Sequence, residues 1–256
     1  MDYFEGIEES DISDKADGSP VTQADRSAEA LIEKELFDII PDIPIVGEEA
    51  AESGRLPDIR QAEYFWCVDP LDGTKEFISG SGDFTVNIAL IRNGQPVIGV
   101  VYAPYTGEMF AGIAGERKED HHAIMMREDL VGGKETKDKF INVRELKKEG
   151  LTVIASKSHV NDEKLEEFLK DYKVAKIAKR GSSLKICQIA AGKADLYPRL
   201  GPTCEWDIAA AHGVLKAAGG DIVDMQGKPM TYGHQDRDFL NPKFVALSDS
   251  ELYQPE

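Results

Sequence analysis

The sequence predicts an α/β fold of the mixed α+β kind, built from two unlike halves. In the first half, strand-forming runs flank Asn93-Gly94, a strong hairpin signal that indicates a mainly antiparallel sheet. In the second half strands and helices alternate, which is typical of an α/β layer. A charged stretch at 147–150 separates them, so we expect an N-terminal half at 1–150 and a C-terminal half at 151–256.

The composition fits a soluble globular chain and argues against one class of partner. Of the 256 residues, 41% are hydrophobic and 30% are charged, which is enough to build a core. The net charge of −17 argues against a nucleic-acid polymer as partner, because such binding relies on Lys and Arg. A small phosphorylated substrate is still compatible with this charge, because a bound cation can invert the local electrostatics.

Sequence features related to localisation indicate the cytoplasm. No apolar run approaches the length of a transmembrane segment, and the acidic residues near Met1 are unlike a signal peptide. The three cysteines, Cys67, Cys187 and Cys204, show no Cys-x-x-Cys spacing, so we expect reduced residues in the core. A peripheral association with the inner membrane face is left open.

A long helix is expected at 22–39, and Pro41 ends it. Thr22 and Asp25 open this helix with the spacing of an N-terminal cap, which is the favoured interpretation on spacing alone. The apolar residues expected on one face are Ala24, Ala28, Leu31, Leu36 and Ile39.

A short strand expected at 43–46 leads into Gly47-Glu48-Glu49. A carboxylate just past a strand end suits a ligand. Glutamates on loops are more often solvated, so Glu48 alone does not decide between the two interpretations.

The central motif follows a buried aromatic strand expected at 64–68. A sharp turn at Pro70 can bring the carboxylates of Asp69 and Asp72 and the carbonyl of Leu71 into one small volume. Hard cations such as Mg²⁺ prefer oxygen ligands of this kind. The alternative is an Asx-type turn, in which the aspartates bond only their own backbone.

Gly73 and Thr74 begin a short helical pattern directly after these aspartates. The first N–H groups of a helix have no partner within the helix, so they are placed to receive a phosphate. The motif therefore combines a candidate metal site with a candidate phosphate seat.

The remainder of the first half adds a hairpin at 84–102 and a strand at 108–113. From 115 to 139 the chain is polar, and we expect a long loop or insertion there. His121 and His122 lie in this stretch without metal-ligand spacing, so we expect them on the surface.

In the second half, Gly181-Ser182-Ser183 joins a strand to a helix, a geometry that favours phosphate binding, with Lys185 close by. An ordinary serine cap is the alternative. Asp207 lies in the first turn of the last helix, where the helix dipole alone would explain it. The strands are expected at 152–155, 174–178 and 194–197, and the helices at 162–172, 183–191 and 204–218.

Four motifs together resemble the inositol monophosphatase-like superfamily of Mg²⁺-dependent, lithium-sensitive phosphatases. They are Pro20-Val21-Thr22-Gln23-Ala24-Asp25, Gly47-Glu48-Glu49, Asp69-Pro70-Leu71-Asp72-Gly73-Thr74 and Trp206-Asp207-Ile208-Ala209-Ala210. They occur in the order of the family and at similar spacings. Further runs, Lys75-Glu76-Phe77-Ile78 and Gly181-Ser182-Ser183-Leu184-Lys185 among them, resemble the 3'(2'),5'-bisphosphate nucleotidase branch.

The resemblance implies a layered α/β/α/β/α sandwich of the inositol monophosphatase-like type, with the site between its two halves. The activity implied is an Mg²⁺-dependent phosphomonoesterase of sulfur metabolism. It would remove the 3'-phosphate of adenosine 3',5'-bisphosphate by direct transfer to water, giving AMP and phosphate.

The resemblance also implies a ligand set for two Mg²⁺ ions. Glu48, Asp69 and the Leu71 carbonyl would hold the first ion. Asp69, Asp72 and Asp207 would hold the second, and a third, weaker ion would lie near Glu48.

The catalytic residues implied are Thr74 and Asp25, which would orient the attacking water, together with Glu48. The amides of Gly73 and Thr74 would seat the phosphate. The substrate-facing residues implied are Glu48, Leu71, Asp72, Gly73, Thr74, Gly181, Ser182, Ser183, Lys185 and Asp207.

Two alternatives stand beside this function. An inositol-phosphate or sugar-phosphate phosphatase would use the same chemistry. A non-catalytic, acidic protein that binds divalent cations belongs to another class, although no Ca²⁺-binding loop signature occurs here. The partner expected is a small phosphorylated nucleotide, and the chain is expected to be a monomer or a homodimer.

Overall fold

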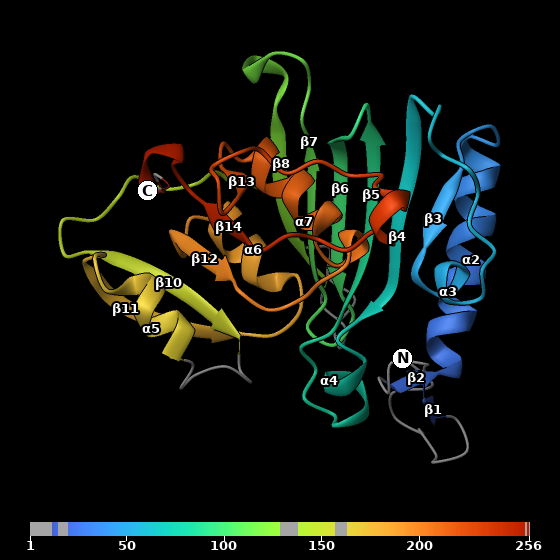
Figure 1. Ribbon diagram of the computed structural model, residues 1–256, viewed down its shortest axis with the longest axis horizontal. Helices are drawn as coiled ribbons and strands as arrows, with labels where there is room; N and C mark the ends of the chain where they lie inside the picture. Colours follow the sequence, from blue (N-terminus) through green and yellow to red (C-terminus); the bar gives the residue numbers. More distant parts are fainter. Residues whose placement is uncertain (1–11, 15–19, 129–137, 157–162, 254, 256) are drawn as a thin grey trace.

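The protein, seen here in a computed structural model, is described over residues 12–14, 20–128, 138–156, 163–253 and 255. Two sheets stand side by side with helices between and outside them (Figure 1). The larger sheet contains, in spatial order, β3 (Ile45–Gly47), β4 (Tyr64–Asp72), β5 (Thr85–Arg92), β6 (Gln95–Ala103), β7 (Glu108–Ile113), β8 (His122–Arg127) and β9 (Lys139–Phe140). The smaller sheet contains β11 (Val174–Arg180), β10 (Leu151–Ser156), β12 (Leu196–Arg199), β14 (Phe244–Leu247) and β13 (Asp221–Asp224).

The helices form three layers around these sheets, and a small ribbon of β1 (Ile12–Asp14) and β2 (Pro20–Thr22) precedes them (Figure 1). The helices are α2 (Gln23–Ile39), α3 (Glu48–Glu52), α4 (Thr74–Ile78), α5 (Glu163–Leu169), α6 (Leu184–Ala190) and α7 (Glu205–Ala217), and the 3-10 turns are Lys118–Asp120, Gln235–Arg237 and Ser250–Leu252.

Three apolar clusters fix the order of the layers. Leu36 of α2 packs on Trp66 of β4 at the outer face of the larger sheet. The central core joins the inner face of that sheet, through Phe110, to α6 and α7. Leu165 of α5 packs on Val153 of β10 at the outer face of the smaller sheet. The resulting α/β/α/β/α order confirms the predicted sandwich.

The larger sheet is mainly antiparallel, as predicted, and among its described strands only β3 and β4 pair in parallel. The β5–β6 hairpin turns at Asn93 and Gly94, whose φ angles of 49° and 75° are the positive values that a tight hairpin turn needs. Strand β4 lies second from one edge of this sheet, where α2 and α3 contact it, and Gly73 joins its end to α4.

Two expectations for this half are wrong. Residues 122–127 form strand β8 rather than a loop, because Ala123 is buried in the central core and Met125 packs against it. On α2, Leu31 and Ile39 are 60% and 67% exposed, although we expected them on the apolar face. Part of the expected loop, residues 129–137, and most of the stretch before Pro20 lie outside the described residues.

Strand β4 continues beyond the predicted end at Val68 and runs through Pro70 to Asp72. The register between β4 and β5 shifts between Asp69 and Asp72, so a bulge accommodates the proline, which has no N–H for the ladder. This irregular strand end carries the central motif.

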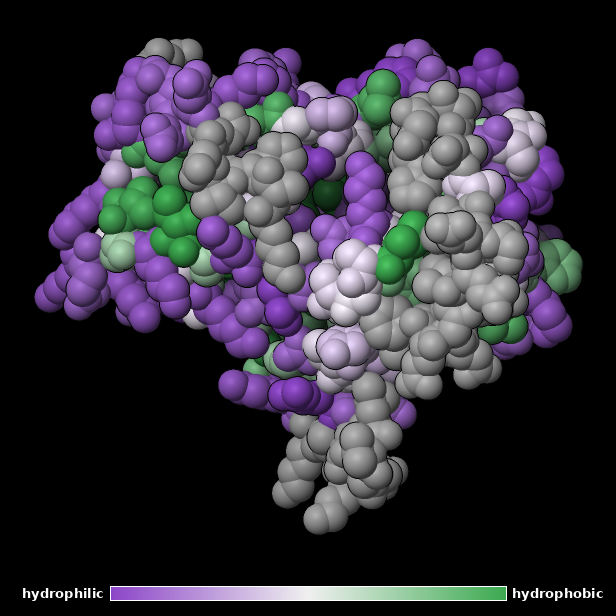
Figure 2. All heavy atoms as spheres, turned by 90° about the horizontal axis from the view of Figure 1, so that it is seen from below, coloured by the Kyte–Doolittle hydropathy of each residue, from purple (hydrophilic) through white to green (hydrophobic). Residues whose placement is uncertain are grey.

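Each element expected in the second half lies within a few residues of its predicted bounds, whereas β13 and β14 were not predicted. The smaller sheet begins at Leu151, directly after the charged stretch at 147–150, but the division of the chain into two halves at residue 150 stays a prediction. Seen from below, most of the coloured surface is hydrophilic, with apolar side chains only in small patches (Figure 2). Among the described helices, none combines the length and the apolar character needed to cross a bilayer.

Candidate active site

The pairing of β3 with β4 brings Glu48 and Asp69 together. The two strands run in parallel, with Gly47 opposite Val68. Glu48, the first residue of α3, directly follows β3, and Asp69 directly follows Val68 in β4, so both lie at the same end of the two paired strands. Strand β5 continues the arrangement, because Thr85 lies opposite Asp72 in the antiparallel ladder.

Four acidic side chains from three distant segments influence one another here. Burial raises the pKa of Asp69 well above its usual range, and the negative charges of Glu48, Asp72 and Asp207 raise it further. Burial likewise raises the pKa of Asp207 to about 8, with Asp72 as the largest charged contributor. Such a cluster is unfavourable without a cation, because like charges in a buried place repel.

Backbone and hydroxyl donors hold three of these carboxylates in the described structure. Asp69 accepts a hydrogen bond from Leu71 N–H at 2.9 Å, and Asp207 accepts one from Cys204 N–H at 3.0 Å. Asp72 accepts one from Ser182 Oγ at 2.6 Å. Within the described residues, no three acidic, histidine or cysteine side chains form a ready-made coordination cage. The donor set, made only of oxygens, nevertheless fits the chemistry of Mg²⁺.

Asp25 links the cap of α2 to the central motif. Its Oδ2 accepts hydrogen bonds from Thr22 N–H at 2.7 Å and from Thr22 Oγ1 at 2.6 Å, which completes a capping box. Its Oδ1 accepts a hydrogen bond from Thr74 Oγ1 at 3.2 Å. The two interpretations of Asp25 are therefore compatible, because one oxygen serves the cap and the other contacts Thr74.

Gly73 makes the turn between β4 and α4. Its φ of 95° is a left-handed value that a side chain would disfavour. The turn leaves Gly73 and Thr74 at the beginning of α4, as the sequence predicts. Phosphate binding by the N–H groups at this position stays a prediction.

The Gly-Ser-Ser turn contacts the central motif directly. The N–H of Ser183 donates to Asp72 at 2.7 Å, and Ser183 Oγ donates to Asn87 Oδ1 at 2.8 Å. Thr85 forms hydrogen bonds with both serine hydroxyls. Ser183 precedes α6 but makes no side-chain cap there, so the capping alternative is wrong for this residue.

A cavity of about 190 Å³ lies between the acidic cluster and this turn. Lys185 lines it, and the Lys185 ammonium lies 5.5 Å from the ring centre of Tyr197. Burial lowers the pKa of Lys185, and the nearby charge of Asp72 offsets part of this effect. The cavity residues are Asp72, Gly73, Glu76, Ser156, Gly181, Ser182, Ser183, Lys185, Ile186, Tyr197, Arg199, Thr203, Asp207 and Ile208.

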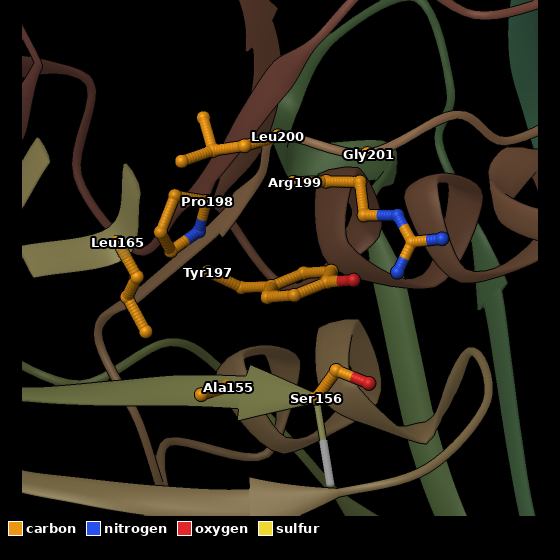
Figure 3. Close-up of a pocket in the computed structure, with 8 residues that line it drawn as sticks. All are labelled: Ala155, Ser156, Leu165, Tyr197, Pro198, Arg199, Leu200 and Gly201. Atoms are coloured by element: carbon orange, nitrogen blue, oxygen red, sulfur yellow. The ribbon is translucent and has the colours of Figure 1, made fainter. Parts of the chain in front are cut away.

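Arg199, to which the sequence analysis gave no role, lines this cavity and a smaller recess of about 40 Å³ beside it. Figure 3 shows the Arg199 guanidinium and the Tyr197 hydroxyl on one side of the recess, with Leu165 and Leu200 on the other. A basic residue at the end of a strand in an acidic chain was the available signal.

The three cysteines differ in burial. Cys67 and Cys187 are buried, as expected, whereas Cys204 is only partly buried. Burial, followed by the charge of Asp207, raises the pKa of Cys204 to about 12, so it stays a thiol near neutral pH.

Comparisons with known proteins identify the family. The model of the inositol monophosphatase family matches residues 1–252. The 3'(2'),5'-bisphosphate nucleotidase CysQ of Shigella flexneri is 42% identical over 245 residues, covering 95% of this chain and 92% of the relative. The same enzyme of Escherichia coli K12 is 41% identical over the same shares.

Solved structures resemble this fold over most of its length. The crystal structure of CysQ from Bacteroides thetaiotaomicron, described as a bacterial member of the inositol monophosphatase family, matches with a TM-score of 0.72 and 36% identity. The match covers 91% of this chain and 86% of that chain. An inositol monophosphatase from Anabaena (Nostoc) sp. PCC 7120 matches with a TM-score of 0.66 and 26% identity, over 89% and 82% of the two chains.

Proposed function

The chain belongs to the inositol monophosphatase family, and from this premise we propose that it is a 3'(2'),5'-bisphosphate nucleotidase. The reaction is hydrolysis of the 3'-phosphate of adenosine 3',5'-bisphosphate to AMP and phosphate. One observation carries this choice within the family. Asp72 and Asp207 of the acidic cluster line the same cavity as Lys185 and Arg199, so a second, anionic group of the substrate has cationic partners.

Enzymes of this family generally use Mg²⁺, and the oxygen donors described above fit that ion. Glu48, Asp69 and the Leu71 carbonyl would hold one ion, and Asp69, Asp72 and Asp207 a second. Bound there, Mg²⁺ supplies Lewis-acid stabilisation of the charge that develops on the phosphoryl oxygens and lowers the pKa of a bound water.

Thr74 and Asp25 orient the attacking water in this proposal. The Thr74 hydroxyl has two acceptors within reach, Asp25 Oδ1 at 3.2 Å and the Leu71 carbonyl at 3.3 Å. With the Leu71 carbonyl on the metal, the hydroxyl donates its hydrogen to Asp25, and its lone pairs accept a hydrogen bond from the water. Asp25 is buried and anchored by Thr22, which fixes the direction of the pair. The N–H groups of Gly73 and Thr74 bind the 3'-phosphate.

The other side of the cavity binds the rest of the nucleotide. Lys185 and Arg199 bind the 5'-phosphate, and the recess beside Tyr197 receives part of the nucleoside. Gly181, Ser182 and Ser183 shape the wall between these places. We place the enzyme in the cytoplasm, because the three cysteines of the chain form no disulfide and a reducing compartment keeps thiols in that state.

The test is phosphate release in the presence of Mg²⁺, with and without Li⁺, from adenosine 3',5'-bisphosphate, inositol 1-phosphate and fructose 1,6-bisphosphate. The proposal predicts that the nucleotide is strongly preferred and that Li⁺ inhibits. A preference for either of the other substrates would replace the nucleotidase with an inositol-phosphate or sugar-phosphate phosphatase. Mg²⁺ binding without turnover of any substrate would favour a non-catalytic protein.

A further inference from the structure

Glu29 lies on the inner side of α2, next to the segment that carries Glu48. Glu29 is only 2% exposed, although its side chain bears a carboxyl group. Burying such a group costs free energy unless hydrogen bonds replace the lost water. Oε2 accepts a hydrogen bond from Glu49 N–H at 2.8 Å, and Oε1 accepts one from Ala50 N–H at 2.7 Å.

The residue before Glu48 leaves room for this carboxylate. Gly47 has φ −113° and ψ 157°, extended values that any residue adopts, so its conformation does not require glycine. An added Cβ would lie 2.5 Å from Glu29 Oε2 and 2.7 Å from Glu29 Cδ, so a side chain at position 47 would displace the Glu29 carboxylate. Glycine at position 47 therefore lets Glu29 keep its bonds to the N–H groups of Glu49 and Ala50.

Glu48 is consequently fixed from both sides. On its N-terminal side, Gly47 is paired with Val68 in the sheet. On its C-terminal side, two successive N–H groups are bonded to Glu29. With both neighbours held, the backbone of Glu48 has one position relative to Asp69.

We propose that Glu29 is a positioning residue for Mg²⁺ binding, which fixes the backbone at 47–50 so that Glu48 is presented to the metal. Glu29 itself does not touch the ion. The inference rests on the proposed function, because it takes Glu48 as a ligand. Removal of a group that orients a metal ligand typically weakens metal binding by about 10-fold to 100-fold.

The experiment measures Mg²⁺ binding by calorimetry without substrate, together with the Mg²⁺ dependence of phosphate release. Glu29→Gln keeps the shape of the side chain but places an amide NH₂ against one of the two backbone N–H groups. We expect the Mg²⁺ dissociation constant to rise by about 10-fold to 100-fold. The kcat at saturating Mg²⁺ should change much less. The control Glu35→Gln removes an exposed carboxylate of the same helix, paired with Lys34, and should bind Mg²⁺ as the wild type does.

A double-mutant cycle tests the contact itself. Gly47→Ala introduces the Cβ that collides with Glu29, so it should weaken Mg²⁺ binding in the wild-type background. In the Glu29→Ala background that collision is gone, so the same substitution should add little. Such non-additivity is expected only for residues in contact.

Thermal melting shows which variants fold. If Glu29→Ala does not fold, the effect of Gly47→Ala on Mg²⁺ binding in the wild-type background still tests the contact. Wild-type Mg²⁺ affinity in folded Glu29→Gln would overturn the inference and leave the proposed function intact. A loss of kcat and stability at unchanged Mg²⁺ affinity would also overturn it, as would strictly additive effects in the cycle. A wild-type chain that binds no Mg²⁺ would overturn the inference together with the proposed function.

Discussion

The carboxylate of Asp72 accepts a hydrogen bond of 2.7 Å from the backbone N–H of Ser183, a residue 111 positions further along the chain. Asp72 ends a strand of the larger sheet, and Ser183 precedes the helix that follows the edge strand of the smaller sheet. The segment that carries the acidic cluster and the segment that faces the substrate are therefore joined at the site itself.

Ser182→Ala should weaken this junction. Ser182 Oγ donates to Asp72 at 2.6 Å, and a hydrogen bond to a charged group contributes about 1.5–3 kcal/mol. We expect the free energy of unfolding to fall by roughly that amount, measured by urea denaturation of the metal-free protein. Ser81→Ala, at an exposed position, is the control. Equal stability of the two variants would argue against the junction.

Arg199→Ala tests whether Arg199 binds the 5'-phosphate of the substrate rather than the 3'-phosphate. If Arg199 binds the 5'-phosphate, the KM for adenosine 3',5'-bisphosphate should rise about 10-fold to 100-fold, as expected for one charge-assisted contact. The KM for adenosine 3'-monophosphate, which lacks that group, should stay near its wild-type value. Arg60→Ala changes an exposed arginine and is the control. An equal rise for both nucleotides would remove Arg199 from this role.

Mg²⁺ binding should strengthen as pH rises from about 6 to about 8. The pKa of Asp207 is raised to about 8, chiefly by burial and then by Asp72, so protons compete with the cation below that pH. Calorimetry in buffers of different ionisation enthalpy should detect about one proton released per site near pH 6.5. Asp207→Asn should reduce that release. Affinity that is independent of pH would contradict the raised pKa.

The raised pKa of Glu29 predicts that the stability of the metal-free protein depends on pH. Burial raises its pKa from 4.5 to about 7, and Glu33 and Glu49 add repulsion, while two backbone N–H groups oppose the shift. A carboxyl with a raised folded pKa contributes no penalty below its unfolded pKa and destabilises increasingly as pH rises through 4.5 to about 7. Relative to Glu29→Gln, the wild type should lose about 2 kcal/mol between about pH 5.5 and about pH 8. The measurement is urea denaturation of both proteins at both pH values. The same difference in free energy of unfolding between the two proteins at both pH values would contradict this.

Periodicity and turn signals were sufficient for most of the fold. The hairpin at Asn93-Gly94 and the helix that begins with Thr22 are where the sequence places them. Strand β8 was missed because its apolar run, Ala123 to Met126, is short and lies within a polar stretch, and pairing with β7 decides its structure. The inner side of α2 was misjudged because it buries carboxylates, Asp25 and Glu29, where an apolar pattern expects hydrocarbon.

The site was less accessible to sequence reasoning. Residues next to each other in a motif, such as Asp69 and Asp72, were found together because the chain itself connects them. Glu29 belongs to no motif, and Arg199 ends the run Leu196-Tyr197-Pro198-Arg199, which resembles the nucleotidase branch but gave Arg199 no role. Packing places Glu29 behind the turn at Gly47 and Arg199 in the cavity that Asp207 lines. Roles of this kind depend on three-dimensional contacts that no local pattern encodes.

The central claim is that Glu48, Asp69, Asp72 and Asp207 gather around cations beside the phosphate to be cleaved. The most direct measurement is anomalous diffraction from crystals of the protein grown with Mn²⁺, which takes the same oxygen ligands as Mg²⁺. The account predicts metal peaks that contact Asp69 and are shared among the other three carboxylates, next to Thr74. Peaks elsewhere, or none in this cluster at saturating metal, would contradict it.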